Sequence, residues 1–259
     1  MKALAAHRRH RLAPVVVLLL ALLGAGLTYS LVAPKPAAAD TADADTIAAG
    51  AALFVANCAT CHGVNAEGGP AGPSLIGVGA AAVDFQVSTG RMPLALSGAQ
   101  APAKPPQFDA DQTAALAAYV ASLGPGPAIP TAEMVDPTGA SAARGMELFR
   151  TNCAQCHNAV GAGGALSEGK YAPALTESSP LVIYEAMLTG PQSMPVFNDA
   201  NISPAEKRDV IAYILAQREA GPGGLGLGGL GPVSEGVWAW VVGIGLLIGA
   251  AVWVGAKSS

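Results

Sequence analysis

Two short cysteine–histidine motifs stand out as residues whose types and spacing can do chemistry. The first runs from Cys58 to His62 with the sequence CATCH, and the second from Cys153 to His157 with the sequence CAQCH. Two thiols one helical turn apart can bond to both vinyl groups of a haem while the adjacent imidazole ligates its iron. The two copies therefore predict two covalently bound haem c groups, attached through Cys58, Cys61, Cys153 and Cys156.

Each haem iron also needs axial ligands, and the motif histidines His62 and His157 supply one each. The other two histidines lie at the extreme N-terminus, so the body of the chain offers no third imidazole. A methionine thioether is the natural second ligand, and it raises the reduction potential of the iron. The methionines available after the first residue are Met92, Met134, Met146, Met187 and Met194.

We expect Met92 and Met194 to ligate the two irons. Both are followed by proline at matching places in the two copies, 30 and 37 residues after the motif histidines. Met187 is a rival because it also lies 30 residues after its histidine. It falls in the apolar run 181–188, however, which favours a core role.

Other residues are expected to support the haem sites. A ligating imidazole usually donates its second ring N–H to a fixed acceptor, and the carbonyls of Pro73 and Pro173 are the candidates unless these prolines only shape their loops. Tyr119 and Tyr213 occupy matching points and are expected to pack on the opening helices rather than to reach a haem propionate. Arg91 either pairs with a propionate or is an ordinary solvated arginine.

The ligand sets limit what the sites can do. With both axial positions filled, neither iron binds a substrate, and the chain moves single electrons. Peroxidase or nitrite-reductase chemistry calls for an open iron beside an acid or base, and the lack of spare histidines argues against it. Structural zinc leaves the repeated Met-Pro pairs unexplained, and a thioredoxin-like dithiol requires a βαβ pattern that is missing.

The motifs sit inside a repeated segment. The pattern G-x-x-L-F-x-x-N-C-A-x-C-H begins at Gly50 and returns at Gly145, an offset of 95 residues, and later Thr-Gly, Met-Pro and Ala-Tyr pairs also return. Apolar residues follow helical spacing in each copy, with opening helices starting near Asp45 and Ser141 and little strand pattern. The sequence predicts an all-α fold with two tandem cytochrome c-type domains.

A closing helix is expected in each copy. In the second copy the sequence Ser-Pro-Ala-Glu from Ser203 is typical of a capping box with proline at the first helical position, and the helix should continue through Leu215. The equivalent helix of the first copy is expected from about Asp109 to Leu123.

Two uncharged apolar stretches flank the repeat and are long enough to cross a membrane, one within 12–33 and one within 237–256. Basic residues before the first stretch and Lys257 after the second both belong on the cytoplasmic side, which places the repeat on the outer face of the cell membrane. Three tryptophans near the ends of the second stretch are expected to anchor it at the interfaces. A small-residue cleavage site at 37–39 leaves open that the first stretch is a signal peptide, in which case the chain is single-pass.

These patterns divide the chain into eight segments. They are a basic cytoplasmic N-terminus (1–11), a transmembrane helix or signal anchor (12–33), a linker (34–45), cytochrome c domain 1 (46–123), a linker (124–140), cytochrome c domain 2 (141–219), a glycine-rich linker (220–234), and a transmembrane helix with its tail (235–259).

The charge of the body is acidic. Residues 34–236 hold all 18 Asp and Glu but only nine Lys and Arg. Nucleic-acid binding depends on basic side chains that displace counterions, so no nucleic-acid partner is expected. A basic protein partner and simple solubility both fit this charge.

The whole pattern resembles the di-haem cytochrome c subunit, or cytochrome cc, of the actinobacterial quinol–cytochrome c reductase (cytochrome bcc complex). The haem motifs indicate only a cytochrome c. The order of two such domains followed by a membrane helix narrows the resemblance to this one family. The resemblance implies a translocase subunit that takes single electrons from a Rieske iron–sulfur protein after menaquinol oxidation and passes them to a haem–copper oxidase. It implies a cytochrome b partner as well, and no turnover by the isolated chain.

Two other interpretations remain open at this point. The same chemistry would serve a di-haem electron-input subunit of another membrane oxidase or dehydrogenase. A metal- or thiol-based structural protein belongs to a different class, and a haem count per chain separates it from the two electron-transfer interpretations.

Overall fold

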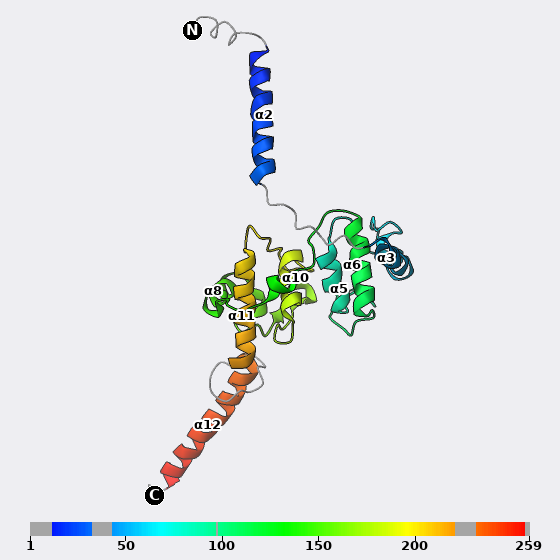
Figure 1. The fold of residues 1–259 in the computed structure, drawn as a ribbon. Helices are drawn as coiled ribbons and strands as arrows, with labels where there is room; N and C mark the ends of the chain where they lie inside the picture. Colours follow the sequence, from blue (N-terminus) through cyan, green and yellow to red (C-terminus); the bar gives the residue numbers. More distant parts are fainter. Residues whose placement is uncertain (1–11, 33–42, 97, 221–231, 257–259) are drawn as a thin grey trace, which may run out of the picture. The chain divides into compact units, whose positions relative to one another are not determined.

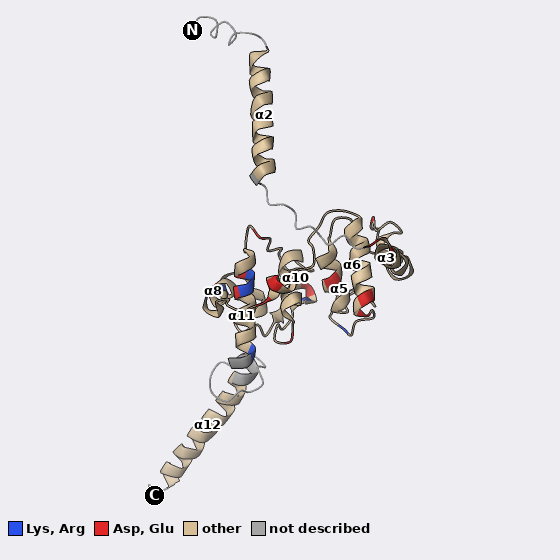
Figure 2. Ribbon diagram, viewed as in Figure 1, with Lys and Arg blue, Asp and Glu red and all other residues tan. Residues whose placement is uncertain are grey.

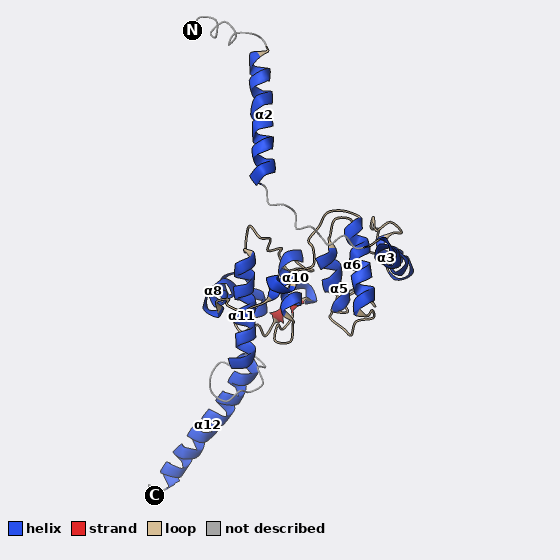
Figure 3. Ribbon diagram, viewed as in Figure 1, coloured by secondary structure: helices blue, strands red, loops and turns tan. Residues whose placement is uncertain are grey.

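The structure, a computed structural model, describes residues 12–32, 43–96, 98–220 and 232–256, and helices make up most of them (Figures 1 and 3). The chain divides into two compact units, Met1–Thr41 and Ala42–Ser259. The described part of the first unit forms the helix α2 (Ala13–Val32). The second unit contains both copies of the repeat and the C-terminal helix α12 (Pro232–Ala256).

The two copies fold into the same series of helices, which confirms the predicted all-α fold. The first copy consists of α3 (Ala44–Asn57), α4 (Ala59–His62), α5 (Ala80–Ser88) and α6 (Ala110–Ser122). The second consists of α8 (Ala142–Asn152), α9 (Ala154–His157), α10 (Pro180–Thr189) and α11 (Pro204–Ala220).

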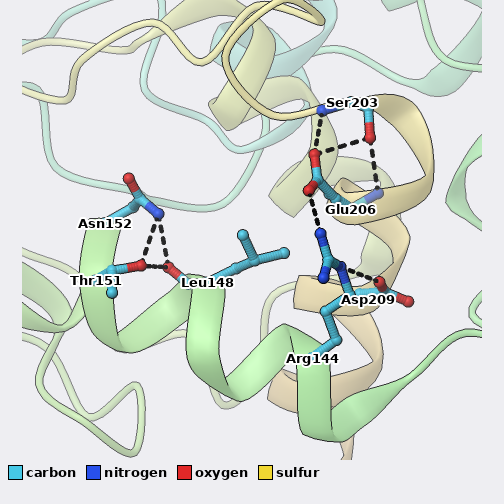
Figure 4. Close-up of polar contacts among 7 residues, drawn as sticks. All are labelled: Arg144, Leu148, Thr151, Asn152, Ser203, Glu206 and Asp209. Carbon is cyan, nitrogen blue, oxygen red and sulfur yellow. Dashed lines mark hydrogen bonds and ion pairs between the residues drawn. The ribbon is translucent and has the colours of Figure 1, made fainter.

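Side-chain caps fix the starts of these helices where the sequence predicts them. Asp43 and Ser141 accept hydrogen bonds from backbone N–H groups in the first turns of α3 and α8. Asp109 and Gln112 form a capping box on α6, and Ser203 with Glu206 forms the predicted one on α11 (Figure 4). The helix α11 continues to Ala220, five residues beyond the predicted end, because residues 216–220 are good helix formers.

The opening and closing helices of each copy cross at a glycine. A Cβ atom added to Gly50 of α3 would lie 2.0 Å from the carbonyl oxygen of Ala115 on α6, and one added to Gly145 of α8 would lie 1.8 Å from that of Asp209 on α11. Only a residue without a side chain allows this approach. The repeated glycine therefore sets the distance between the two helices.

Aromatic pairs pack beside both crossings. The ring centroids of Phe54 and Tyr119 lie 5.2 Å apart, and those of Phe149 and Tyr213 lie 5.4 Å apart. The Tyr213 hydroxyl donates to the carbonyl oxygen of Ala159 at 2.6 Å. The expectation that both tyrosines pack on the opening helices is confirmed.

Polar contacts add to the second crossing. Arg144 on α8 pairs with Glu206 on α11 at 2.7 Å and with Asp209 at 3.8 Å (Figure 4). In the same close-up, the Asn152 side chain donates to the carbonyl oxygen of Leu148 one turn earlier. This contact ties the last residue of α8 to its own helix, directly before the second cysteine motif.

Four short elements have no counterpart in the sequence predictions. The strands β1 (Gly164–Ala165) and β2 (Tyr171–Ala172) pair antiparallel around a 3-10 turn, η1 (Ser167–Gly169). The helical turn α7 (Ala132–Val135) lies inside the predicted linker, and its Met134 and Val135 pack against the core of the second domain. Strands of two residues carry too little alternation for a sequence pattern to reveal.

The helix α2 and the helix α12 are long and apolar enough to span a membrane, as predicted. Neither α2 nor residues 236–256 of α12 contain a charged residue (Figure 2). Three exposed tryptophans lie near the two ends of α12, at 238, 240 and 253. The residues behind the predicted orientation and cleavage, namely 1–11, 37–39 and Lys257, lie outside the described residues, as do 221–231 of the glycine-rich linker.

The two domains pack through α5 and α10, and two glutamines join them beside this contact. The Gln100 side chain exchanges two hydrogen bonds with the backbone of Tyr171, both of 2.8 Å. The Gln192 side chain exchanges two with the backbone of Ala101, both of 2.9 Å. We call these four bonds the glutamine clamps.

A carboxyl pair, the buried Glu185 and the half-buried Asp84, lies at the same interface. Glu185 on α10 is fully buried. In the part of the chain that the structure describes, neither of its carboxylate oxygens accepts a hydrogen bond from an N–H or hydroxyl group. Burial, and then the neighbouring Asp84 on α5, raises the pKa of Glu185 to about 9. Burial also raises the pKa of Asp84. At neutral pH the pair therefore holds a proton between its two carboxyl groups.

We expect Gly145→Ala to destabilise the second domain by about 3 kcal/mol or more, since overpacking against backbone cannot be relieved by a side-chain rotation. A thermal unfolding scan of the detergent-solubilised chain measures the loss. Gly243→Ala in α12 is the control, because a Cβ there meets nothing within 4 Å. Equal stability of Gly145→Ala and the native chain would show that the crossing is not tight.

We expect the stability of the native chain to fall as pH rises from about 4.5 to about 9, because the folded state keeps the Glu185 proton over the range in which the unfolded state releases it. Glu185→Gln should flatten this part of the pH profile, and the exposed Glu147→Gln should not. Melting temperatures measured across this pH range test the prediction. A Glu185→Gln profile as steep as that of the native chain would contradict it.

Candidate functional site

Both cysteine motifs sit at the sharp turn between an opening helix and a single helical turn. The first cysteine of each motif ends the opening helix, with φ and ψ of −122° and −30° at Cys58 and −121° and −34° at Cys153. Their N–H groups donate to Phe54 and Phe149, each at 2.8 Å. The repeated sequence thus gives repeated backbone geometry at the points where haem attachment is predicted.

The tautomer of each motif histidine is fixed by a backbone carbonyl. The Nδ1 atom of His62 lies 2.8 Å from the carbonyl oxygen of Pro73, and that of His157 lies 2.9 Å from the carbonyl oxygen of Pro173. A carbonyl oxygen can only accept, so Nδ1 carries the proton in both rings. The Nε2 lone pair of each ring is left available for a metal, and the predicted role of the two prolines is confirmed.

The second histidine lies in a more buried environment than the first. His157 is only 9% exposed, whereas His62 is half-buried. Burial lowers the pKa of His157, although its bond to Pro173 acts in the opposite direction. The ring is therefore neutral at physiological pH, which is the form that ligates iron.

A cavity opens beside the second motif. Its wall contains Cys153, Cys156 and His157 together with Met187 and Met194. Apolar side chains from three helices complete much of the wall, among them Phe149, Ile183, Val210 and Ile214. The cavity thus offers two thiols, an imidazole nitrogen and thioethers as donors, surrounded by an apolar wall. This combination fits a covalently attached haem.

Both methionines considered for the second site line this cavity, but they differ in setting. Met187 is 2% exposed and belongs to the core cluster of α10, at the place where the first copy has the buried Val87. Met194 follows α10 in a loop and is half-buried, with Pro195 also on the cavity wall. The core setting of Met187 agrees with the role expected from the apolar run.

In the first copy, Met92 and Cys58 pack against one core cluster, which includes Phe54 and Val87. The Met92 N–H donates to the carbonyl oxygen of Gln86 on α5 at 2.9 Å, which holds the methionine close to that helix. The structure therefore packs the predicted cysteine and methionine of the first site against the same core cluster.

Several residues around the second cavity were not identified from the sequence. Arg218 on α11 donates to the carbonyl oxygens of Leu175 and Ser178, which both line the cavity. Gln100 also lines it, although this residue belongs to the first domain. Arginine and glutamine are common on protein surfaces, so their residue types alone gave no signal of these contacts.

The alternative metal and thiol chemistries gain no support. Among the described residues, no three His, Cys, Asp or Glu side chains gather in the way that a zinc site requires. The four cysteines form no disulfide. Burial, and then the neighbouring Cys156, raises the pKa of Cys153 to about 11, which opposes the thiolate needed for dithiol exchange.

Comparison with known proteins agrees with two haem domains. Residues 47–124 match the family described as cytochrome c, and residues 140–214 match the family described as cytochrome c oxidase, cbb3-type, subunit III. The two cytochrome c domains carry two covalently bound haem c groups.

Whole-chain relatives share one description, cytochrome bc1 complex cytochrome c subunit. The relative from Corynebacterium efficiens is 47% identical over 96% of this chain and 90% of its own length. Those from Mycobacterium bovis and Mycobacterium leprae are 48% and 45% identical over 96% and 94% of this chain, and 92% and 87% of their own lengths. With its two apolar helices, this chain is a membrane-anchored electron-transfer protein, and it belongs to the family of cytochrome c subunits of the cytochrome bc1 complex.

Proposed function

We propose that the two haems have matching attachment and ligand residues. Cys58 and Cys61 attach the first haem, with His62 and Met92 as its axial ligands. Cys153 and Cys156 attach the second, with His157 and Met194 as its axial ligands. The observation that carries the proposal is the Nδ1 bond of each histidine to a proline carbonyl, because it leaves Nε2 free to bind iron in both copies.

A bound haem c supplies reversible one-electron chemistry at its iron. The residues of this chain hold it and set its properties. The proline carbonyls orient the imidazoles and increase their basicity, while the methionines close the sites to other ligands. The apolar wall of the second cavity excludes water, which disfavours the more highly charged oxidised iron and so favours a high potential.

We further propose that the chain relays single electrons within a quinol–cytochrome c reductase. The electrons come from a Rieske iron–sulfur protein after menaquinol oxidation and leave to a haem–copper oxidase, with a cytochrome b subunit as a further partner. The names of the relatives support membership of a bc-type complex. Two electron carriers in one compact unit support a relay within a single subunit.

We propose that both haem domains lie on the outer face of the cell membrane. Basic residues precede the first apolar helix and Lys257 follows the second, and basic flanks stay in the cytoplasm. An orientation with the haems outside allows exchange of electrons with partners exposed on that face. Cleavage of the first helix would leave α12 as the anchor with the same orientation.

Met194→Ala should lower the midpoint potential of one haem, because a haem that loses its thioether loses the ligand that favours reduced iron. Met187→Ala should lower stability by about 2–5 kcal/mol instead, as for other buried methionines, and leave both potentials unchanged. Potentiometric titration of each purified variant separates the two effects. The opposite pattern would transfer the ligand role to Met187.

Purification of the tagged chain from its native membrane tests the proposed relay. We expect two covalent haems per chain, a co-purifying cytochrome b and Rieske protein, and haem reduction upon addition of a menaquinol analogue. Removal of the Rieske protein should abolish this reduction, while dithionite still reduces both haems. Co-purification with a dehydrogenase that does not oxidise quinol, in place of cytochrome b and the Rieske protein, would contradict the proposal.

A further inference from the structure

One cation of the first domain faces the haem cavity of the second. Arg91 directly precedes Met92, so sequence order places it beside the first haem. In the structure it lines the cavity that contains Cys153, Cys156 and His157. Phe85 and Gln100 are the other first-domain residues on this wall. The cavity of the second haem is therefore built from both domains.

The Arg91 guanidinium has no anionic partner there. Its charge centre lies 4.8 Å above the ring centroid of the buried Phe85, within range of a cation–π contact. Among the residues that the structure describes, it donates no hydrogen bond and forms no ion pair. A half-buried cation without an anion is unfavourable, so the surroundings of Arg91 fit an added negative charge.

The backbone around Arg91 keeps it at the domain boundary. A hydrogen bond from the Met92 N–H to the carbonyl oxygen of Gln86 folds the chain back over the end of α5. The glutamine clamps then join the following segment to the second domain through Gln100 and Gln192, and both glutamines line the same cavity. The position of Arg91 relative to this cavity thus depends on the docking of the two domains.

We propose that Arg91 is a positioning residue for the second haem and that its guanidinium binds a propionate carboxylate of that haem. A haem carries two propionates, and a guanidinium fork matches a carboxylate in shape and charge. The first domain would then hold part of the cofactor that the second domain attaches. This proposal rests on the attachment of the second haem through Cys153 and Cys156.

The pairing has a consequence for electron transfer. An unpaired propionate anion near the iron stabilises the oxidised state, which carries one more positive charge. A guanidinium on the propionate cancels that charge and so raises the potential of the second haem. The same residue is joined to Met92, the proposed ligand of the first iron, so one short segment contacts both haem sites.

Arg91→Gln removes the charge and keeps a side chain of similar reach. We expect this variant to keep two haems per chain and to lower the midpoint potential of the second haem, with the first unchanged. Arg91→Lys should restore much of the potential because it restores the charge. Arg150→Gln, which removes an exposed arginine of α8 that is absent from the cavity wall, should leave both potentials unchanged.

A variant that lacks the second haem shows which of the two measured potentials belongs to the first haem. Cys153→Ala with Cys156→Ala leaves one haem, and Arg91→Gln should not change its potential. If that background fails to fold, the component whose potential falls in Met194→Ala identifies the second haem. Unchanged potentials in Arg91→Gln, or a shift of the first haem alone, would overturn the proposal. An equal shift in Arg150→Gln would also overturn it. A haem count other than two would instead contradict the haem assignment itself.

A double-mutant cycle tests whether Arg91 acts across the domain boundary. Gln100→Ala with Gln192→Ala removes the glutamine clamps and should lower the second potential in the same direction. Arg91→Gln added to this pair should then have a smaller effect than it has in the native chain. Fully additive shifts would show that Arg91 does not need the docked domains, and would overturn the cross-domain assignment.

Discussion

The close crossing of the opening and closing helices is the constraint on which each haem domain depends. Backbone meets backbone at Gly50 and Gly145, where a single methyl group would overlap a carbonyl oxygen. This crossing places Phe54 and Phe149 against the tyrosines of the closing helices. Those phenylalanines accept the hydrogen bonds that end the opening helices at the first motif cysteines. The position of each haem attachment turn therefore follows from the close approach of the opening and closing helices.

From that turn the chain returns to the histidine by a loop. In both copies the loop presents a proline carbonyl to Nδ1, although the two loops differ in length and only the second forms strands. The contact that orients the imidazole is thus the same in both copies, although the loops that provide it differ. His157 is more buried than His62, and the strands β1 and β2 contact α9, the helical turn that ends at His157. The duplicated domains therefore share the hydrogen bond that orients the motif histidine and differ in the exposure of that histidine to water.

Much of each haem site was predictable from sequence because its determinants are local. The motif spacing and the caps at Ser141 and Asp109 each depend on residues that lie only a few positions apart in the sequence. The proline acceptors were predictable because both copies of the repeat contain a proline at this place. The contacts between domains were not predictable in this way. Gln100 meets Tyr171, and Arg91 reaches a cavity of the other copy, only because α5 packs on α10. Comparison of the two copies predicts features within each domain, but it does not predict the contacts between the domains.

The interface itself consists of places where the two copies differ. With Thr89 and Thr189 in register, the buried Phe85 of α5 corresponds to the buried Glu185 of α10. In the first copy this position supports Arg91, and in the second it faces Asp84. The glutamines of the clamps are likewise not equivalent, since Gln100 follows Met92 and Gln192 precedes Met194. Identical interface residues would favour symmetric pairing of the two copies or of separate chains. Different residues at equivalent places instead favour one arrangement within one chain, and so a single relative position of the two cytochrome c domains.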